Sequence, residues 1–149
     1  MQKEIDMTLQ IRTGTWAELQ ADAKPIREQV FIQEQGIAEA DEWDTQDEVS
    51  QHFVVYADEH VIATARLLPN HSIGRVAVLA SHRGQGIGRQ LMLEIIQQAQ
   101  QQCRPLLQLS SQVHAIAFYQ NLGFEVRGDE YLDCGIPHID MQMSLAEST

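Results

Sequence analysis

The organisation of this chain follows from Arg83-Gly84-Gln85-Gly86-Ile87-Gly88, in which three glycines alternate with other residues. The apolar stretch before it, residues 74–79, predicts a strand. After it, an apolar residue recurs every four positions, which predicts an amphipathic helix with Ile87, Leu91, Ile95 and Ala99 on one face. The glycines therefore predict a turn from a strand into a helix, where positive φ angles and the close approach of another molecule are tolerated.

A turn of this kind is suited to binding phosphate. The first N–H groups of a helix have no partner within the helix, and the helix dipole makes that end positive. Arg83 and Arg89 add positive charge on both sides. The P-loop of nucleotide triphosphatases is excluded because no Lys follows Gly88, and the dinucleotide fingerprint fails because Arg89 stands after Gly88. The alternative is a tight turn that serves packing alone.

The length and composition predict one domain, residues 1–149, of ordinary globular character. The chain is 44% hydrophobic and 21% charged, and no apolar run reaches the length of a membrane span. The first residues lack the apolar core of a secretory signal. The two cysteines, Cys103 and Cys134, have no metal-ligand spacing, so we expect free thiols in a reducing cytoplasm.

The formal net charge of −11 bears on the partner. It argues against a general nucleic-acid-binding protein, which needs a basic face. It fits a small cationic partner such as an amine. Solubility alone explains the charge equally well.

The remaining patterns predict an α+β fold. Thr15 and Glu18 have the spacing of a capping box, and Pro25 is expected to start a second helix that ends at Gly36. Short turns join three strands into an antiparallel meander. The expected strands are Thr8–Arg12, His52–Ala57, Val61–Leu68, Ser72–Leu79, Leu106–Leu109, Phe124–Val126, Tyr131–Cys134 and Ile139–Leu145, with a helix over Val113–Leu122. Together they predict a mixed, mostly antiparallel sheet between layers of helices.

Residues 36–51 are rich in acidic side chains and lack the ligand pattern of an EF-hand. We expect a solvated loop. The alternative is an acidic lip that attracts a cationic substrate, with Trp43 anchoring the loop or touching that substrate.

Three groups of motifs resemble the GCN5-related N-acetyltransferases. The glycine turn is similar to the pyrophosphate loop of that family, and 115–124 is similar to its Ala-x-x-Phe-Tyr-x-x-x-Gly-Phe segment. Residues 27–35 resemble the Arg-x-x-Val-Phe-x-x-Glu-Gln segment of the ElaA-like branch, as do 63–67, 73–78 and 135–138. The resemblance covers about residues 8 to 145 and implies acetyl transfer from acetyl-CoA to the primary amine of a small molecule or peptide, without a metal.

The resemblance also implies roles for individual residues. The strand segment Val76-Ala77-Val78 pairs with the pantetheine arm, and the Val78 N–H polarises the thioester. The pyrophosphate is held by the backbone N–H groups of Arg83, Gly84, Gln85, Gly86, Ile87, Gly88 and Arg89. Gln112 stands where many members have an asparagine that contacts the pantetheine. Tyr119 faces the cofactor sulfur and protonates the leaving thiolate, since a phenol stays protonated at neutral pH.

The base that accepts the amine proton is left open. Glu34 and Glu28 lie on the helix that borders the acceptor site in this fold. His138 begins the last strand, and histidine is a residue type suited to accept a proton. Arg66 is a candidate contact for a carboxylate on the acceptor. Each of these residues also has a structural interpretation. For Glu34, the alternative to a catalytic role is an ion pair with Arg27. The expected surface or turn histidines are His52, His60, His71, His82 and His114.

Two other functions remain open at this level. The chain could bind acetyl-CoA as a sensor or partner module without efficient turnover, although Tyr119 stands where an acid is needed. It could also be a nucleotide-binding module. Homodimers are common in the family, but no interface is visible in the sequence.

Overall fold

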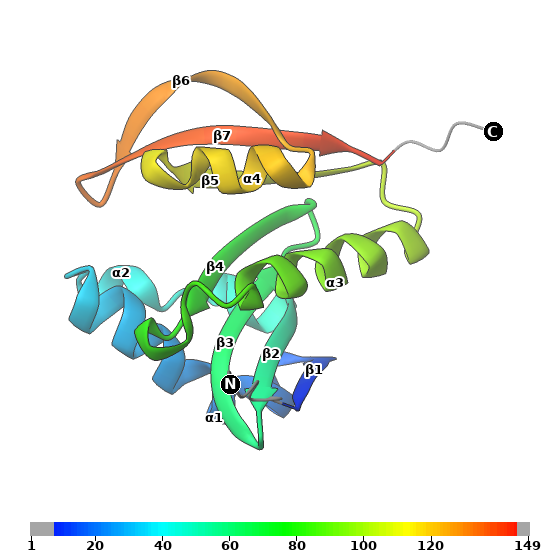
Figure 1. The fold of residues 1–149 in the computed structure, drawn as a ribbon. Coiled ribbons are helices and arrows are strands. Elements are labelled where there is room, and N and C mark those ends of the chain that lie inside the picture. Colours follow the sequence, from blue (N-terminus) through cyan, green and yellow to red (C-terminus); the bar gives the residue numbers. More distant parts are fainter. Residues whose placement is uncertain (1–7, 146–149) are drawn as a thin grey trace, which may run out of the picture.

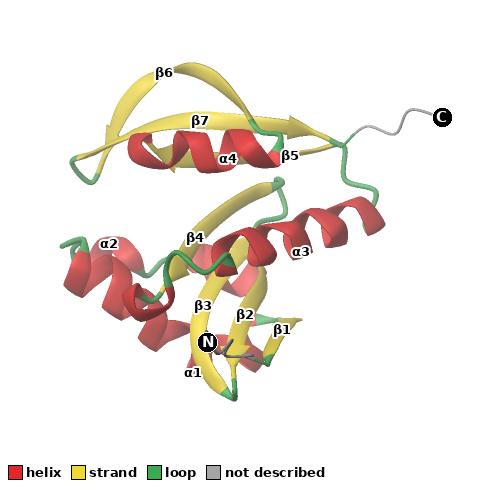
Figure 2. Cartoon of the chain, in the orientation of Figure 1, coloured by secondary structure: helices red, strands yellow, loops and turns green. Residues whose placement is uncertain are grey.

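A seven-stranded mixed sheet, in the order β1-β2-β3-β4-β5-β7-β6, is the centre of the structure (Figures 1 and 2). The structure is a computed structural model, and it describes residues 8–145. The strands are β1 (Leu9–Gly14), β2 (Gln51–Ala57), β3 (His60–Leu67), β4 (Ser72–Val78), β5 (Leu106–Gln112), β6 (Glu125–Asp133) and β7 (Ile136–Ser144). The α-helices are α1 (Trp16–Arg27), α2 (Glu39–Glu42), α3 (Ile87–Gln101) and α4 (Ile116–Leu122).

The strand pairing confirms the α+β fold expected from the sequence. Strands β1 to β4 form an antiparallel meander, and β5, β7 and β6 are also antiparallel. The pair β4–β5 is parallel and joins these two parts of the sheet. The sheet is therefore mixed and mostly antiparallel, as predicted.

Helices cover both faces of the meander. Val54 of β2 packs with Leu19 and Ala23 of α1, whereas its neighbours Phe53 and Val55 belong to the cluster that contains α3. Because successive residues of a strand point to opposite faces, α1 and α3 lie on opposite sides of the sheet. The predicted apolar face of α3 is fully buried there, at Ile87, Leu91, Met92, Ile95 and Ala99.

The first helix begins as predicted but does not stop at Pro25. The capping box between Thr15 and Glu18 is present. Pro25 lies inside α1, and the chain stays helical through a π-helical segment, η1 (Glu28–Glu34). The expected second helix is therefore wrong. We attribute the continuity to burial of Ile26 and Val30, which follow the proline; this burial outweighs the loss of one backbone hydrogen bond.

The solvated loop expected over residues 36–51 is present only in part. Glu39, Asp41, Asp44 and Glu48 are exposed. The segment nevertheless forms α2 and a 3₁₀ helix, η2 (Thr45–Val49), and the side chains of Glu42 and Asp47 are buried. Arg27 of α1 donates to both carboxylates, at 2.8 Å from Nε to Glu42 and 2.7 Å from Nη1 to Asp47. The predicted pair between Arg27 and Glu34 is therefore wrong.

Two more arginines complete this ion network. Arg66 of β3 donates to Asp44 and Asp47, and Arg75 of β4 donates to Glu42 and Asp44. The guanidinium of Arg27 also lies 4.9 Å from the ring centre of Trp43, so Trp43 anchors the segment. The segment is thus fastened to α1, β3 and β4 by balanced charges.

His52 is buried beside this network, which corrects its expected place on the surface. Its Nε2 lies 2.8 Å from the backbone oxygen of Asp47. A carbonyl oxygen only accepts hydrogen bonds, so Nε2 carries the proton. Burial removes water from the ring, and this loss of solvation is the main reason that the pKa of His52 is lowered.

The last third of the chain has the predicted sequence of strand, helix and strands, but β5 and β7 are longer than expected and two expected strands are one. Helix α4 ends at Gly123, whose φ of 109° suits a glycine cap. Two separate strands were expected between residues 124 and 134, but β6 is one strand whose pairing with β7 shifts between Arg127 and Tyr131. This irregularity explains why the sequence pattern is interrupted there.

Candidate active site

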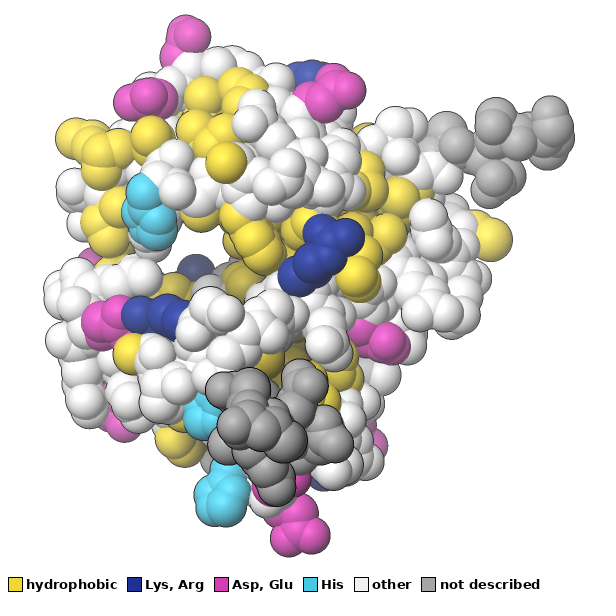
Figure 3. All heavy atoms as spheres, viewed as in Figure 1, with side chains coloured by type: hydrophobic (Ala, Val, Ile, Leu, Met, Phe, Trp, Pro, Cys, Tyr) yellow, Lys and Arg dark blue, Asp and Glu magenta, His cyan; other side chains and the backbone are white. Residues whose placement is uncertain are grey.

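Strands β4 and β5 separate soon after they pair. Their register contains only Ser72 with Gln108 and Ile73 with Leu109. Beyond that point Arg75 has a φ of 51°, and the pairing of β4 with β3 is irregular, so β4 bends away from β5. Figure 3 shows the molecule hollowed between the part that carries β4 and the part that carries β5. We call this hollow the cleft.

The backbone of Val78 faces away from β3, on the side of the cleft. The next residue, Leu79, donates its N–H to Ile62 of β3 at 2.9 Å. Backbone groups of successive strand residues point to opposite sides, so the N–H and C=O of Val78 point away from β3. Arg83 Nε donates to the Val78 oxygen at 2.9 Å, which places the guanidinium of Arg83 at this strand edge.

The glycine turn opens directly beside that strand edge. Gly86 caps α3 in the left-handed conformation, with φ 81° and ψ 10°. The first backbone bond of α3 runs from Gln90 to Gly86, so the N–H groups of Ile87, Gly88 and Arg89 precede all bonds within the helix. The turn thus places backbone donors at the positive end of a helix of 15 residues.

Gly88 lies where α3, α4 and the end of β4 meet. A Cβ atom built on Gly88 would lie 3.5 Å from Cζ of Phe118 and 3.8 Å from Cγ2 of Val78, which are ordinary contact distances. This contact brings the segment that contains Tyr119 next to the glycine turn.

Tyr119 lies among aromatic side chains. Its ring meets Phe118 and Phe124 edge to face, with centroids 5.0 and 6.0 Å apart. Burial raises the pKa of Tyr119 to about 12. The phenol is therefore protonated at any physiological pH and is able to donate a proton or a hydrogen bond.

Glu34 and Gln35 touch two other residues that the sequence assigned to the site. The carboxylate of Glu34 accepts from Arg83, at 2.5 Å from Nη1 and 2.8 Å from Nη2. The next side chain, Gln35, accepts from Gln112 Nε2 at 3.0 Å. Hydrogen bonding to Arg83 lowers the pKa of Glu34. The end of the π-helical segment is therefore bonded both to the glycine turn and to the end of β5.

His138 lies on β7 directly opposite Gln112. Its Nδ1 is 2.7 Å from the backbone oxygen of Ile136, so Nδ1 carries the proton and Nε2 of the neutral ring is the acceptor. The ring is buried and stacks on Tyr131, with centroids 6.2 Å apart. Glu28, by contrast, lines a separate hollow of about 380 Å³ with Trp16 and Trp43.

Two features of the site were not predicted from the sequence. One is Gln35, and the other is a polar group of Tyr131, Asp140 and Ser110 on the same sheet face as Gln112. Tyr131 donates to Asp140 at 2.6 Å and is hydrogen-bonded to Ser110. Register pairs Ser110 with Asp140, two positions from the pair Gln112 and His138. The polar residues at every second position of β5 and β7 were the available signal, but which strands would be neighbours was not visible.

Arg66 is not available to bind a carboxylate on an acceptor, because Asp44 and Asp47 already occupy it. That suggestion is therefore not supported. Cys103 and Cys134 are free, exposed thiols, as expected. Among residues 8–145, no group of His, Cys, Asp and Glu side chains is arranged to hold a metal ion.

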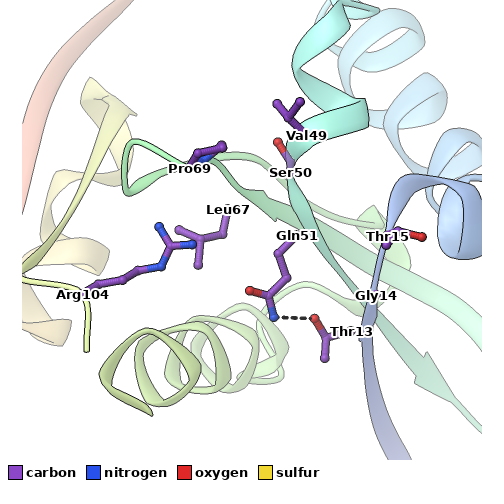
Figure 4. A pocket seen from close by; sticks show the side chains of 9 residues that line it. All are labelled: Thr13, Gly14, Thr15, Val49, Ser50, Gln51, Leu67, Pro69 and Arg104. Carbon is purple, nitrogen blue, oxygen red and sulfur yellow. Dashed lines mark hydrogen bonds between the residues drawn. The ribbon is translucent and has the colours of Figure 1, made fainter. Parts of the chain in front are cut away.

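A cavity of about 450 Å³ lies at the other end of the sheet (Figure 4). Arg104 points into it, and Leu67 and Pro69 form an apolar wall. Nη1 of Arg104 already donates to the Leu68 oxygen and contacts His71, which accounts for its position. The cavity is remote from the cleft because it lies at the end of β3 that leads into β4, whereas the glycine turn follows the end of β4.

Comparison with known proteins identifies the family. The family described as "Acetyltransferase (GNAT) domain" matches residues 19–145. The uncharacterised N-acetyltransferase YjcF of Bacillus subtilis is 35% identical over 124 residues, which are 80% of this chain and 89% of YjcF.

None of the helices in the described part of the chain has the length and apolar character needed to span a membrane.

Solved structures agree with this match. An acyl-CoA N-acyltransferase from Pseudomonas aeruginosa is 30% identical, with a TM-score of 0.82 over 91% of this chain and 99% of the other. ElaA of Escherichia coli is 28% identical, with a TM-score of 0.83 over 91% of this chain and 99% of ElaA. This chain therefore belongs to the GNAT family and is an acetyltransferase related to ElaA.

Proposed function

We propose that this enzyme transfers an acetyl group from acetyl-CoA to the primary amine of a small molecule or peptide, with both substrates bound at once. The observation that carries this proposal is the separation of β4 and β5 beside the glycine turn. It exposes the backbone edge of Val78 and the first N–H groups of α3 to one elongated ligand that carries phosphate.

The residues present fit such a ligand. A Cβ atom built on Gly84 or Gly86 would meet nothing within 4 Å, so the turn presents its backbone to open space. The N–H groups from Arg83 to Arg89 would hold the diphosphate at the positive end of α3. The edge of Val76-Ala77-Val78 would pair with the pantetheine amides, and Gln112 would contribute its side-chain amide from β5.

Bound acetyl-CoA supplies a thioester whose acetyl group is open to attack by an amine. In our proposal the Val78 N–H donates a hydrogen bond to the oxygen that gains negative charge during transfer. Loss of one donor of this kind typically lowers the rate about 100- to 1000-fold. Tyr119 donates a proton or hydrogen bond to the sulfur as the thiolate leaves, and its pKa of about 12 keeps the phenol protonated until then.

His138 is the better candidate for the base. The Ile136 carbonyl fixes the proton on Nδ1, which leaves a lone pair on Nε2 to accept the amine proton. Glu34 is a weak candidate because its carboxylate already accepts two hydrogen bonds from Arg83, which lower its pKa. We therefore assign proton acceptance to His138 and a different role to Glu34.

We propose that the acceptor carries a positively charged group in addition to its reacting amine. Asp140 lies on the same sheet face as Gln112 and His138, where Tyr131 donates to it. In the register of β6 and β7, Arg127 stands opposite Asp140, but its guanidinium pairs with Glu125. A carboxylate whose charge is not taken up in an ion pair favours a cationic substrate.

The proposal is tested by thiol release. Purified protein is mixed with acetyl-CoA and a panel of amines, and the free CoA released is measured. The control is the same mixture without an amine. We expect release to depend on an amine and to fall in Tyr119→Phe. Calorimetric binding of CoA without release for any amine would instead favour the sensor module, and stabilisation by ATP or NAD but not CoA would favour a nucleotide-binding module.

A further inference from the structure

Two consecutive side chains at the end of the π-helical segment contact both sides of the cleft. Glu34 accepts from Arg83 beside the glycine turn, and Gln35 accepts from Gln112 at the end of β5. Both contacts involve residues proposed to hold the cofactor. The same segment therefore borders the path of the diphosphate and the path of the pantetheine.

The position of Arg83 does not depend on Glu34 alone. Its Nε donates to the Val78 oxygen at 2.9 Å, which tethers the guanidinium to the end of β4. Glu34 uses the other two nitrogens, Nη1 and Nη2. Removing the carboxylate of Glu34 would therefore leave Arg83 near the glycine turn with its positive charge uncompensated.

The contact between Glu34 and Arg83 is suited to exchange. The side chains are 41% and 42% exposed, so water competes for both partners. Exposed ion pairs are weakly held, and the two-pronged geometry makes this pair one of the stronger of them. A diphosphate carries more negative charge than one carboxylate and also receives the backbone N–H groups of the turn.

We infer that Glu34 competes with the cofactor diphosphate for Arg83. The carboxylate of Glu34 pairs with Arg83 in the free enzyme and is displaced when the diphosphate binds. This inference rests on the proposed function, because the diphosphate site is itself proposed. It explains why an acidic residue lies beside a site for an anion. It also replaces the suggestion that Glu34 is the general base.

The test compares the affinity of Glu34→Gln and wild-type protein for three probes by calorimetry. The probes are CoA, inorganic pyrophosphate and pantetheine, which lacks the diphosphate. We expect CoA and pyrophosphate to bind about two- to tenfold more tightly to the variant, and pantetheine to bind equally. The gain should shrink as salt rises, because exposed charges are screened.

A matched control is Glu125→Gln. Glu125 forms an exposed pair with Arg127 on β6, at 3.2 Å, so this change removes the same charge from a similar pair elsewhere. It should leave all three affinities unchanged. In an Arg83→Gln background, Glu34→Gln should likewise lose its effect, because the group for which Glu34 competes is gone.

Three outcomes would overturn the inference. Weaker CoA binding by Glu34→Gln would make Glu34 a residue that positions Arg83. Equal CoA affinity with a large loss of kcat would return Glu34 to the role of base. Equal gains for pantetheine and CoA would place the effect away from the diphosphate. Wild-type protein that binds no CoA would instead remove the proposed function, and this inference with it.

Discussion

Arg27 and Asp47 form a two-pronged salt bridge that is almost completely buried, with Nη1–Oδ1 at 2.7 Å and Nη2–Oδ2 at 3.1 Å. The same Oδ1 also accepts from Arg66 at 2.8 Å. One carboxylate of the acidic segment therefore joins α1 to β3. Through Glu42 the network continues to Arg75, the residue at which β4 bends away from β5. The acidic segment thus supports the strand geometry that opens the cleft.

Asp47→Asn should destabilise the protein by about 3–5 kcal/mol, because it leaves buried arginine charge without its anion. The free energy of unfolding is measured by urea denaturation. The control is Glu48→Gln, an exposed neighbour that should stay within about 0.5 kcal/mol of wild type. A loss below about 1 kcal/mol for Asp47→Asn would show that other contacts hold the segment.

Stability should fall as the pH drops below about 6.5, the ordinary pKa of histidine. Burial lowers the pKa of His52 in the folded protein. The unfolded chain therefore binds a proton near the ordinary pKa while the folded chain does not, so the contribution of His52 is complete above that pH and is lost below it. Urea midpoints at about pH 7.5 and about pH 5.5 measure the change.

His52→Gln provides the comparison for this pH effect. Glutamine keeps an N–H donor for the Asp47 oxygen but does not titrate. The difference between the two midpoints should therefore be smaller than in wild type. An equal difference would assign the pH dependence to groups other than His52.

Gly86→Val should abolish CoA binding while the protein stays folded. The φ of 81° at Gly86 disfavours a β-branched residue, at a cost of about 1–2 kcal/mol, which most domains tolerate. The new side chain would extend into the open space where the diphosphate is proposed to bind. Circular dichroism checks the fold and calorimetry the binding. A folded variant with wild-type affinity for CoA would reduce the turn to a packing feature.

Tyr119→Phe should lower kcat about 10- to 1000-fold and leave KM for acetyl-CoA within a few-fold. Phenylalanine keeps the ring contacts with Phe118 and Phe124 but removes the hydroxyl. The measurement needs conditions in which chemistry, not product release, limits the rate. An unchanged kcat there would take Tyr119 out of the mechanism. A higher KM at constant kcat would leave it only a cofactor contact.

Short-range patterns were sufficient for much of the fold. The capping box at Thr15, the glycine turn at Gly86 and the buried face of α3 depend on residues within one or two helical turns, so the sequence predicts them directly. Pro25 misled the prediction because its local preference was overruled by burial of Ile26 and Val30.

The partners of charged side chains were beyond the reach of the sequence. Glu34 meets Arg83 across 49 positions and Gln35 meets Gln112 across 77, and neither spacing carries a periodic signal. Glu42, Asp44 and Asp47 looked solvated because their arginines lie on α1, β3 and β4. The sequence by itself determined the glycine turn, its helix and the antiparallel meander of β2, β3 and β4, since these follow from neighbouring residues. Only the tertiary structure decided which charges are buried in pairs and where β4 leaves β5, because both depend on segments that meet only when the sheet is assembled.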